Sequence, residues 1–249
     1  MNIGQFLTKD QTLVWTLTTS GYKFYTLNLY RHLQAAKVPW KLAIVCADKP
    51  VYRFFRNEGI PCVLYEKAQS DSTGQMLLFG SKPFQEINLV KLDILASFAA
   101  RPEIATCIYL DGDVAVGRDF VPDIVEKLAA TPLLFQCDEQ RKEACVKPCK
   151  NCCTGLIAWS HGHDGGIFKV TDKATWSQAP EDQRWVNTQL QAKQVPYDTM
   201  PRELYPNGVF SEGWKAECPQ FSILHYNWLV GPAKLARMKK NGHWLLPYL

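Results

Sequence analysis

The sequence predicts an α/β fold in which a mixed, mostly parallel sheet is flanked by helices. Short apolar runs of strand length alternate with segments of helical periodicity through the first half of the chain, and this alternation is typical of parallel strands joined by crossover helices. The chain has 249 residues and no internal repeat or linker-like segment, which suits one domain with a substantial core. We therefore expect a single domain over residues 1–249.

The first three predicted strands are separated by two helices. Residues 12–19 (TLVWTLTT) form a buried strand that ends in a polar turn. Apolar residues then recur at steps of three and four over 22–36, which is one face of a helix. The runs at 42–46 and 62–65 are the next strands, and a helix at 51–55 lies between them.

The middle of the chain continues the alternation after a polar segment. Residues 68–83 contain two glycines and predict a loop. A helix at 87–98 leads to a strand at 107–110, and a helix at 124–128 leads to a strand at 133–135. Beyond Cys137 the pattern weakens, and only a strand at 156–159 and a helix at 182–192 are indicated.

Composition excludes several classes of protein. Hydrophobic residues make up 47% and charged residues 21% of the chain, as in globular proteins. The net charge is only +4, with Lys and Arg scattered, so we expect no nucleic-acid partner. No signal-peptide pattern and no membrane span is evident. Nine cysteines, several within apolar runs, favour buried thiols and a cytoplasmic location.

The segment 145–153 carries four of the cysteines and allows three interpretations. Cys149 and Cys152 have the spacing of a zinc-binding pair, but a second separated pair is missing. A disulfide is the second interpretation. Reduced cysteines in an insertion near the acceptor side are the third, and this is the one we expect.

Asp111-Gly112-Asp113 is the strongest functional signal. An apolar strand delivers these two acids to its carboxyl end, where open α/β sheets bind their ligands. In an extended chain both side chains would project to the same side, and they would repel each other unless a cation lay between them. A divalent cation there could bridge to a diphosphate, and Gly112 would let the backbone approach it. A solvated Asp-Gly-Asp turn is the alternative.

The Asp-Gly-Asp segment resembles the DxD motif of glycosyltransferases with the GT-A fold, the nucleotide-diphospho-sugar transferases. It is most similar to their retaining groups, which include glycogenin, the bacterial lipopolysaccharide galactosyltransferases and a plant xylosyltransferase-like family. The likeness extends over most of the chain as weaker motifs around this stronger one. It implies a GT-A domain with a nucleotide-sugar-binding half at about 1–116 and an acceptor-side half at about 117–249.

The resemblance also implies roles for residues upstream of the motif. Lys91, on the helix before the Asp-Gly-Asp strand, would contact the donor sugar or phosphate; a solvated helix lysine is the alternative. The loop after the first strand would receive the nucleoside, with Thr16, Thr18 and Gly21 as its contacts.

Downstream, the resemblance places further residues around the donor sugar. Thr154 and Gly155 would lie beneath it, and Asp182 and Gln183 would face the reacting sugar carbon, although Asp182 could instead cap a helix. Asp138, which follows the strand at 133–135, could bind sugar hydroxyl groups.

The C-terminal motif HYNW completes the comparison. The resemblance implies that His225 is the third metal ligand beside Asp111 and Asp113, and that Lys234 meets the diphosphate; a structural histidine is the alternative. The spacing between His225 and Lys234 is longer than in the lipopolysaccharide group. Oxygen ligands with one imidazole favour Mn²⁺ over Mg²⁺.

These motifs predict a metal-dependent glycosyltransferase that moves a sugar from a nucleotide-diphosphate donor to a glycan, protein or small-molecule acceptor. If the resemblance holds, the anomeric configuration is retained. Two alternatives stay open. One is a nucleotidyltransferase that makes nucleotide sugars, although the Gly-rich basic signature of such enzymes is missing from residues 16–21. The other is a non-catalytic sugar-binding protein with the same fold.

Overall fold

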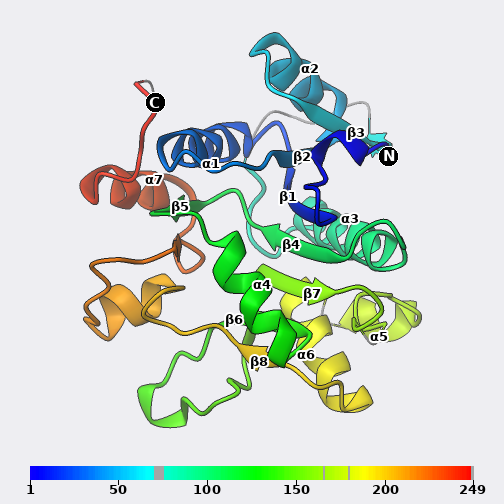
Figure 1. Ribbon diagram of the computed structural model, residues 1–249, viewed down its shortest axis with the longest axis vertical. Helices are drawn as coiled ribbons and strands as arrows, with labels where there is room; N and C mark the ends of the chain where they lie inside the picture. Colours follow the sequence, from blue (N-terminus) through cyan, green and yellow to red (C-terminus); the bar gives the residue numbers. More distant parts are fainter. Residues whose placement is uncertain (70–75, 165, 179, 248–249) are drawn as a thin grey trace.

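A seven-stranded sheet with the order β3-β2-β1-β4-β7-β6-β8 runs through the computed structural model, which describes residues 1–69, 76–164, 166–178 and 180–247 (Figure 1). Strand pairs are parallel from β3 to β4 and between β6 and β8, whereas β7 is antiparallel to both of its neighbours. The expected mixed, mostly parallel sheet is therefore confirmed. Its strands are β1 (Thr12–Thr18), β2 (Leu42–Asp48), β3 (Cys62–Gln69), β4 (Thr106–Leu110), β6 (Leu133–Cys137), β7 (Cys152–Ser160) and β8 (Asp198–Thr199).

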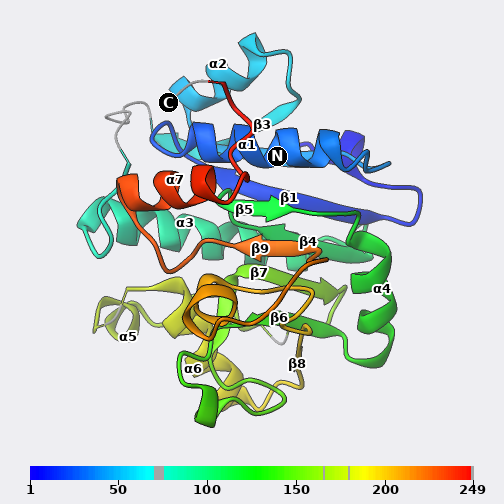
Figure 2. The ribbon, with the colours of Figure 1, turned by 90° about the vertical axis from the view of Figure 1, so that its left-hand side faces the viewer.

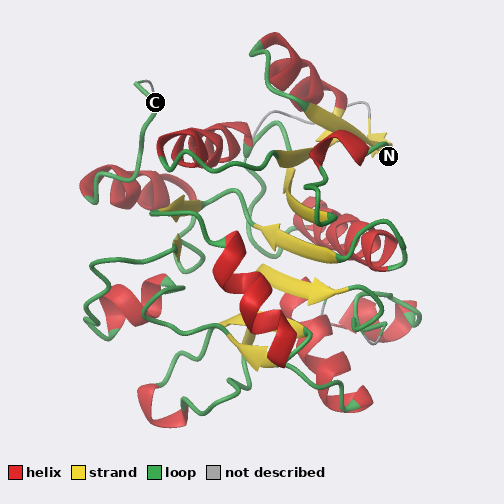
Figure 3. Cartoon of the chain, in the orientation of Figure 1, coloured by secondary structure: helices red, strands yellow, loops and turns green. Residues whose placement is uncertain are grey.

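Helices cover both faces of this sheet (Figure 3). One apolar cluster holds side chains of α1 (Lys23–Ala35), α2 (Lys49–Asn57) and α4 (Val121–Ala130). The cluster on the opposite face holds side chains of α3 (Lys82–Ala99), α5 (Lys173–Gln178) and α6 (Asp182–Lys193). Side chains of a strand alternate between the two faces, so neighbouring residues of β1 such as Val14 and Trp15 belong to different clusters.

A second, two-stranded sheet lies beside the end of β4 (Figure 2). It pairs β5 (Val114–Val116) with β9 (Ile223–His225) in antiparallel register, and α7 (Gly231–Lys240) packs next to it. The sequence did not predict either strand, because three residues are too few to show a period. This small sheet brings the C-terminal part of the chain to the Asp-Gly-Asp segment.

Helix starts follow from local sequence. The Asp48 carboxylate accepts a hydrogen bond from the Val51 N–H at 2.9 Å and caps α2, while Ser81 caps α3. Both helices carry proline in their first turn, where its missing N–H costs nothing. The predicted loop at 68–83 is shorter than expected, because β3 continues to Gln69 and α3 begins at Lys82; its residues 70–75 lie outside the described part.

The cysteines differ from the expectation in one respect. Cys137 and Cys149 form a disulfide, so the prediction that all cysteines are reduced is wrong for this pair. Antiparallel pairing places Cys152 opposite Cys137, and the turn before β7 brings Cys149 to 5.6 Å from Cys137 between Cα atoms. The other seven cysteines are free.

No described helix has the length and apolar character needed to span a membrane. The division into halves at residue 116 stays a prediction.

Candidate active site

Asp111 and Asp113 lie in the turn that connects β4 to β5. The turn is not extended, in contrast to the geometry expected from the sequence. The Asp111 N–H donates to the Gly155 carbonyl at 2.8 Å, which ties the turn to β7. Asp113 is only 2% exposed, whereas Asp111 is partly exposed. The Asp113 side chain is thus buried, whereas Asp111 is in contact with solvent.

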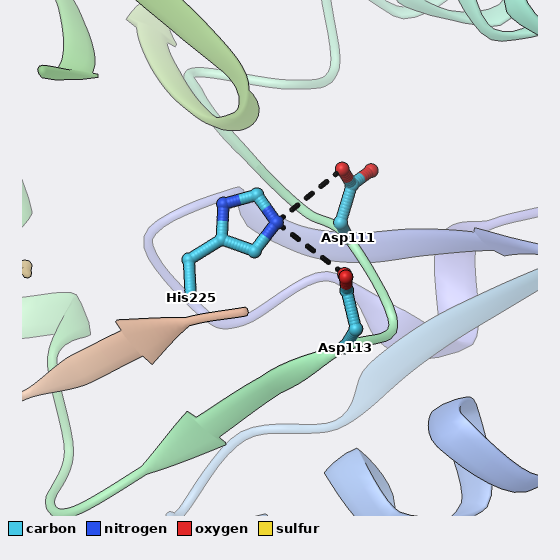
Figure 4. A group of neighbouring side chains, drawn as sticks. All are labelled: Asp111, Asp113 and His225. Atoms are coloured by element: carbon cyan, nitrogen blue, oxygen red, sulfur yellow. Dashed lines mark ion pairs between the residues drawn. The ribbon is translucent and has the colours of Figure 1, made fainter. Parts of the chain in front are cut away.

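His225 faces both acids from the neighbouring strand (Figure 4). Its Nε2 atom lies 3.3 Å from Asp113 Oδ1 and 3.6 Å from Asp111 Oδ2. The cause is the register of the small sheet, which pairs His225 with Val114, the residue after Asp113. The structure therefore brings together the three residues predicted as metal ligands.

The chemistry of this group suits a divalent cation. Each residue offers one ligand atom, and these atoms lie within 4.8 Å of one another; no other such group is found in the described ranges. Asp113 Oδ1 and His225 Nε2 are both buried and have no hydrogen-bond partner, although buried polar atoms are nearly always satisfied. A cation bound between them would satisfy both. Two carboxylates with one imidazole suit Mn²⁺ better than Mg²⁺.

Two lysines neutralise part of the negative charge around this group. Lys91 on α3 is buried, and its Nζ atom lies 3.2 Å from Asp111 Oδ1 and 2.8 Å from Asp182 Oδ2. Lys234 on α7 pairs with Asp113 and donates to the Tyr22 hydroxyl at 2.9 Å. The longer spacing before Lys234 thus does not keep it from the acids. Three carboxylates share two ammonium groups, which leaves one negative charge to be balanced by His225 or by a cation.

The pKa shifts in this network follow from its charges. Burial alone would raise the pKa of Asp113, but Lys234 and His225 outweigh it and hold that pKa well below its ordinary value. Burial likewise opposes the charged forms of Asp182 and Lys91, but their mutual attraction lowers the pKa of Asp182 and, with Asp111, raises that of Lys91. All three groups therefore stay charged at neutral pH.

Two glycines allow the close approach of backbone to this site. A Cβ atom on Gly155 would lie 2.0 Å from His225 Cε1 and 2.7 Å from Asp111 Oδ2. A Cβ atom on Gly112 would lie 2.7 Å from Thr26 Oγ1. Cβ atoms essentially never lie closer than 3.0 Å to another heavy atom, so a larger residue at position 155 would shift His225 or Asp111, and one at position 112 would shift Thr26.

Asp182 and Gln183 begin α6. Lys91 links Asp182 to Asp111, because its ammonium group pairs with both carboxylates. The N-cap of α6 is Glu181, so Asp182 is not the cap; its carboxylate accepts instead from Lys91 and from the Thr154 hydroxyl at 2.8 Å. Gln183 Nε2 donates to Asp138 Oδ2 at 3.0 Å. Residues predicted to surround the donor sugar are thus linked to one another.

Asp138 is the centre of a group of amides of which the sequence analysis predicted only Gln183. Its Oδ1 atom accepts hydrogen bonds from Asn207 Nδ2 at 2.5 Å and from Asn227 Nδ2 at 2.8 Å. Gln183 also bonds Asn151 at 3.1 Å. Single amides carry no sequence pattern, so only the fold reveals this group.

The predicted nucleoside contacts divide between core and surface. Gly21 lines a cleft of about 690 Å³ with Thr19 and Asp48, at the carboxyl ends of β1 and β2 and along α3. Thr16 and Thr18 are buried inside β1, and the Thr18 hydroxyl accepts a hydrogen bond from Thr26 at 2.9 Å. Gly21 therefore borders the cleft, whereas the hydroxyl groups of Thr16 and Thr18 are enclosed by protein. Contact of these three residues with a donor stays a prediction.

The sequence profile of the nucleotide-diphospho-sugar transferases matches residues 40–238, most of the chain. The chain belongs to this family. It is 26% identical over 263 residues to the β-arabinofuranosyltransferase RAY1 of Arabidopsis thaliana, with 95% of this chain and 48% of that protein covered. The chain thus spans about half the length of this curated relative.

Solved glycosyltransferase structures share the fold of this family member. The galactosyltransferase LgtC matches with a TM-score of 0.59 and 15% identity, over 95% of this chain and 96% of that chain. Mouse xyloside xylosyltransferase 1 matches with a TM-score of 0.55 and 9% identity, over 87% and 97% of the two chains. At such identities the likeness concerns the fold, and it confirms the expected GT-A architecture.

Proposed function

We propose that this chain transfers a sugar from a nucleotide-diphosphate donor to an acceptor hydroxyl, with a divalent cation held by Asp111, Asp113 and His225. The observation that carries the proposal is the pair of buried, unpartnered atoms, Asp113 Oδ1 and His225 Nε2, that face each other at 3.3 Å. Family membership supports the same reaction class. Two alternatives have less support. The Gly-rich basic signature of nucleotidyltransferases is missing from residues 16–21, and the full set of predicted metal ligands argues against a non-catalytic sugar-binding protein.

The proposed reaction breaks the bond between the anomeric carbon and the diphosphate through an oxocarbenium-like transition state. When bound, a divalent cation would stabilise the negative charge that develops on the leaving diphosphate. Lys234, in the first turn of α7, and Lys91 would add positive charge at the same place. Both ammonium groups are buried and paired before the donor arrives, so little reorganisation is needed.

Asp182 and Gln183 would position the sugar on the other side of the breaking bond. The Asp182 carboxylate is held by Lys91 and Thr154, and it stays ionised because its pKa is lowered, with burial outweighed by Lys91. An ionised carboxylate at this point would support positive charge on the sugar ring. We propose that Asp138, with its three amide donors, fixes this side of the site, and that the configuration is retained.

The identity of the substrates is a further part of the proposal. The names of the relatives indicate arabinofuranose, galactose and xylose as donor sugars to test first. The acceptor would be a glycan, a protein or a small molecule. A cytoplasmic location also stays a proposal. Cys137 and Cys149 are buried in the folded protein, so the thiols are counted after acid quenching of intact cells and unfolding of the protein. Nine labelled thiols would support a cytoplasmic location, whereas seven would show that the Cys137–Cys149 disulfide is present in the cell and would contradict it.

The test is release of nucleoside diphosphate from a panel of nucleotide sugars with and without Mn²⁺. We expect metal-dependent release that Asp113→Asn reduces at least about 100-fold. Asp10→Asn, at an exposed position, is the matched control and should retain full activity. Release of pyrophosphate instead would favour the nucleotidyltransferase, and donor binding without turnover across acceptors would favour the non-catalytic alternative.

A further inference from the structure

Gln136, at the end of β6, is completely buried and lies directly behind the candidate metal ligand His225. Its Nε2 atom donates to the backbone carbonyls of Tyr205 and Pro206, both at 3.0 Å. Carbonyl oxygens only accept hydrogen bonds, so the amide nitrogen must occupy this side. The Oε1 atom must then face the His225 ring, where it lies 2.9 Å from Nδ1.

This orientation determines which ring nitrogen carries the hydrogen. An amide oxygen can only accept, so His225 Nδ1 must donate to it. A neutral imidazole has one N–H, which leaves Nε2 with a lone pair. Cys153 Sγ lies farther from Nδ1, at 3.6 Å, and a thiol is the weaker acceptor. In the other tautomer, the Nδ1 lone pair would face the Gln136 oxygen and both atoms would repel.

We propose that Gln136 is a positioning residue that holds His225 in the Nδ1–H tautomer, so that Nε2 presents its lone pair toward Asp111 and Asp113. The backbone carbonyls on the far side of the amide lock its orientation, so Nδ1 is the nitrogen that keeps its hydrogen, whether a proton or a cation lies between Nε2 and the two carboxylates. The importance of this Gln136–His225 hydrogen bond for catalysis rests on the proposed function. Partners of this kind behind a metal ligand typically change metal affinity 10–100-fold.

The tautomer can be observed directly in the cation-free protein by long-range ¹H–¹⁵N correlation of the histidine rings. His225→Ala identifies the His225 signals among those of five histidines. At a pH where the ring is neutral, we expect the Nδ1–H form in the wild type and a shift toward the Nε2–H form in Gln136→Met, which keeps the size and removes the acceptor. A wild-type ring in the Nε2–H form would overturn the proposal.

Mn²⁺ affinity, measured by electron paramagnetic resonance of the free ion, is the second readout. Gln136→Met should bind Mn²⁺ about 10–100-fold more weakly. Asn28→Leu is the matched control, because it removes a buried amide that bonds His243 and Leu245 instead.

Wild-type Mn²⁺ affinity in Gln136→Met would contradict the role of Gln136. If Gln136→Met fails to fold, the wild-type spectrum decides. If the wild type has the Nδ1–H form but binds no Mn²⁺, the metal proposal fails and the assignment to Gln136 stands.

Discussion

Replacing Gly155 with alanine would push one added carbon atom into the candidate metal site. The new Cβ would lie 2.0 Å from His225 Cε1, where ordinary contacts begin at 3.4 Å, so the ring or the strand must move by more than 1 Å. A displacement of about 1 Å at a reacting site can cost about 100-fold in rate, while overpacking costs about 1–3 kcal/mol of stability. We therefore expect Gly155→Ala to remain folded and to bind Mn²⁺ about 10–100-fold more weakly.

The assay is titration of Mn²⁺ at constant protein, with urea unfolding of the same samples. Gly213→Ala is the matched control, because its added Cβ meets only a Val209 methyl group at an ordinary 3.7 Å, and it should bind Mn²⁺ like the wild type. Folded Gly155→Ala with unchanged Mn²⁺ affinity would refute the reasoning, since the ligand atoms could then not lie where the structure places them.

Three further predictions concern stability. Lys91→Met leaves the buried Asp182 carboxylate without its ammonium partner and should cost about 3–5 kcal/mol in urea unfolding; a loss below about 1 kcal/mol would contradict a buried pair. Cys149→Ser opens the loop closed by the disulfide to Cys137, with a sequence separation of 12, and should cost about 3 kcal/mol; nine reactive thiols instead of seven in the unreduced, unfolded wild type would show that the disulfide is absent. Burial lowers the pKa of His243 from 6.5 to about 4, so the unfolded chain binds more protons in that range and stability should fall as pH falls from 6.5 to 4. His243→Gln should remove about 1–2 kcal/mol of that loss of stability after allowance for solvent screening. The same pH dependence of stability in this variant as in the wild type would contradict the lowered pKa of His243.

The parts of the fold that were predictable carry a local signal. The strands β1, β2 and β4 are short, mainly apolar runs, and α1 and α3 show helical periodicity, so their types follow from the sequence. The strands β5 and β9 have three residues each, and their pairing depends on contacts between segments more than 100 residues apart. Such short strands form because the fold brings them together.

The candidate site divides in the same way. Asp111 and Asp113 could be predicted because two acids directly after a core strand form a local pattern. His225, Asp182 and Lys234 entered through resemblance, and their convergence depends on the small sheet and on α7. Gln136 had no signal, because a single glutamine in an apolar strand is uninformative until its two hydrogen-bonding sides are seen.

The central claim is that Asp111, Asp113 and His225 bind one divalent cation that also holds the donor diphosphate. Anomalous diffraction at the manganese edge, from crystals soaked with Mn²⁺ and a nucleoside diphosphate, tests it most directly. The account predicts one anomalous peak within coordination distance of all three side chains, with diphosphate density in contact with it. Nucleotide density in the cleft with no peak between the three side chains would contradict the claim.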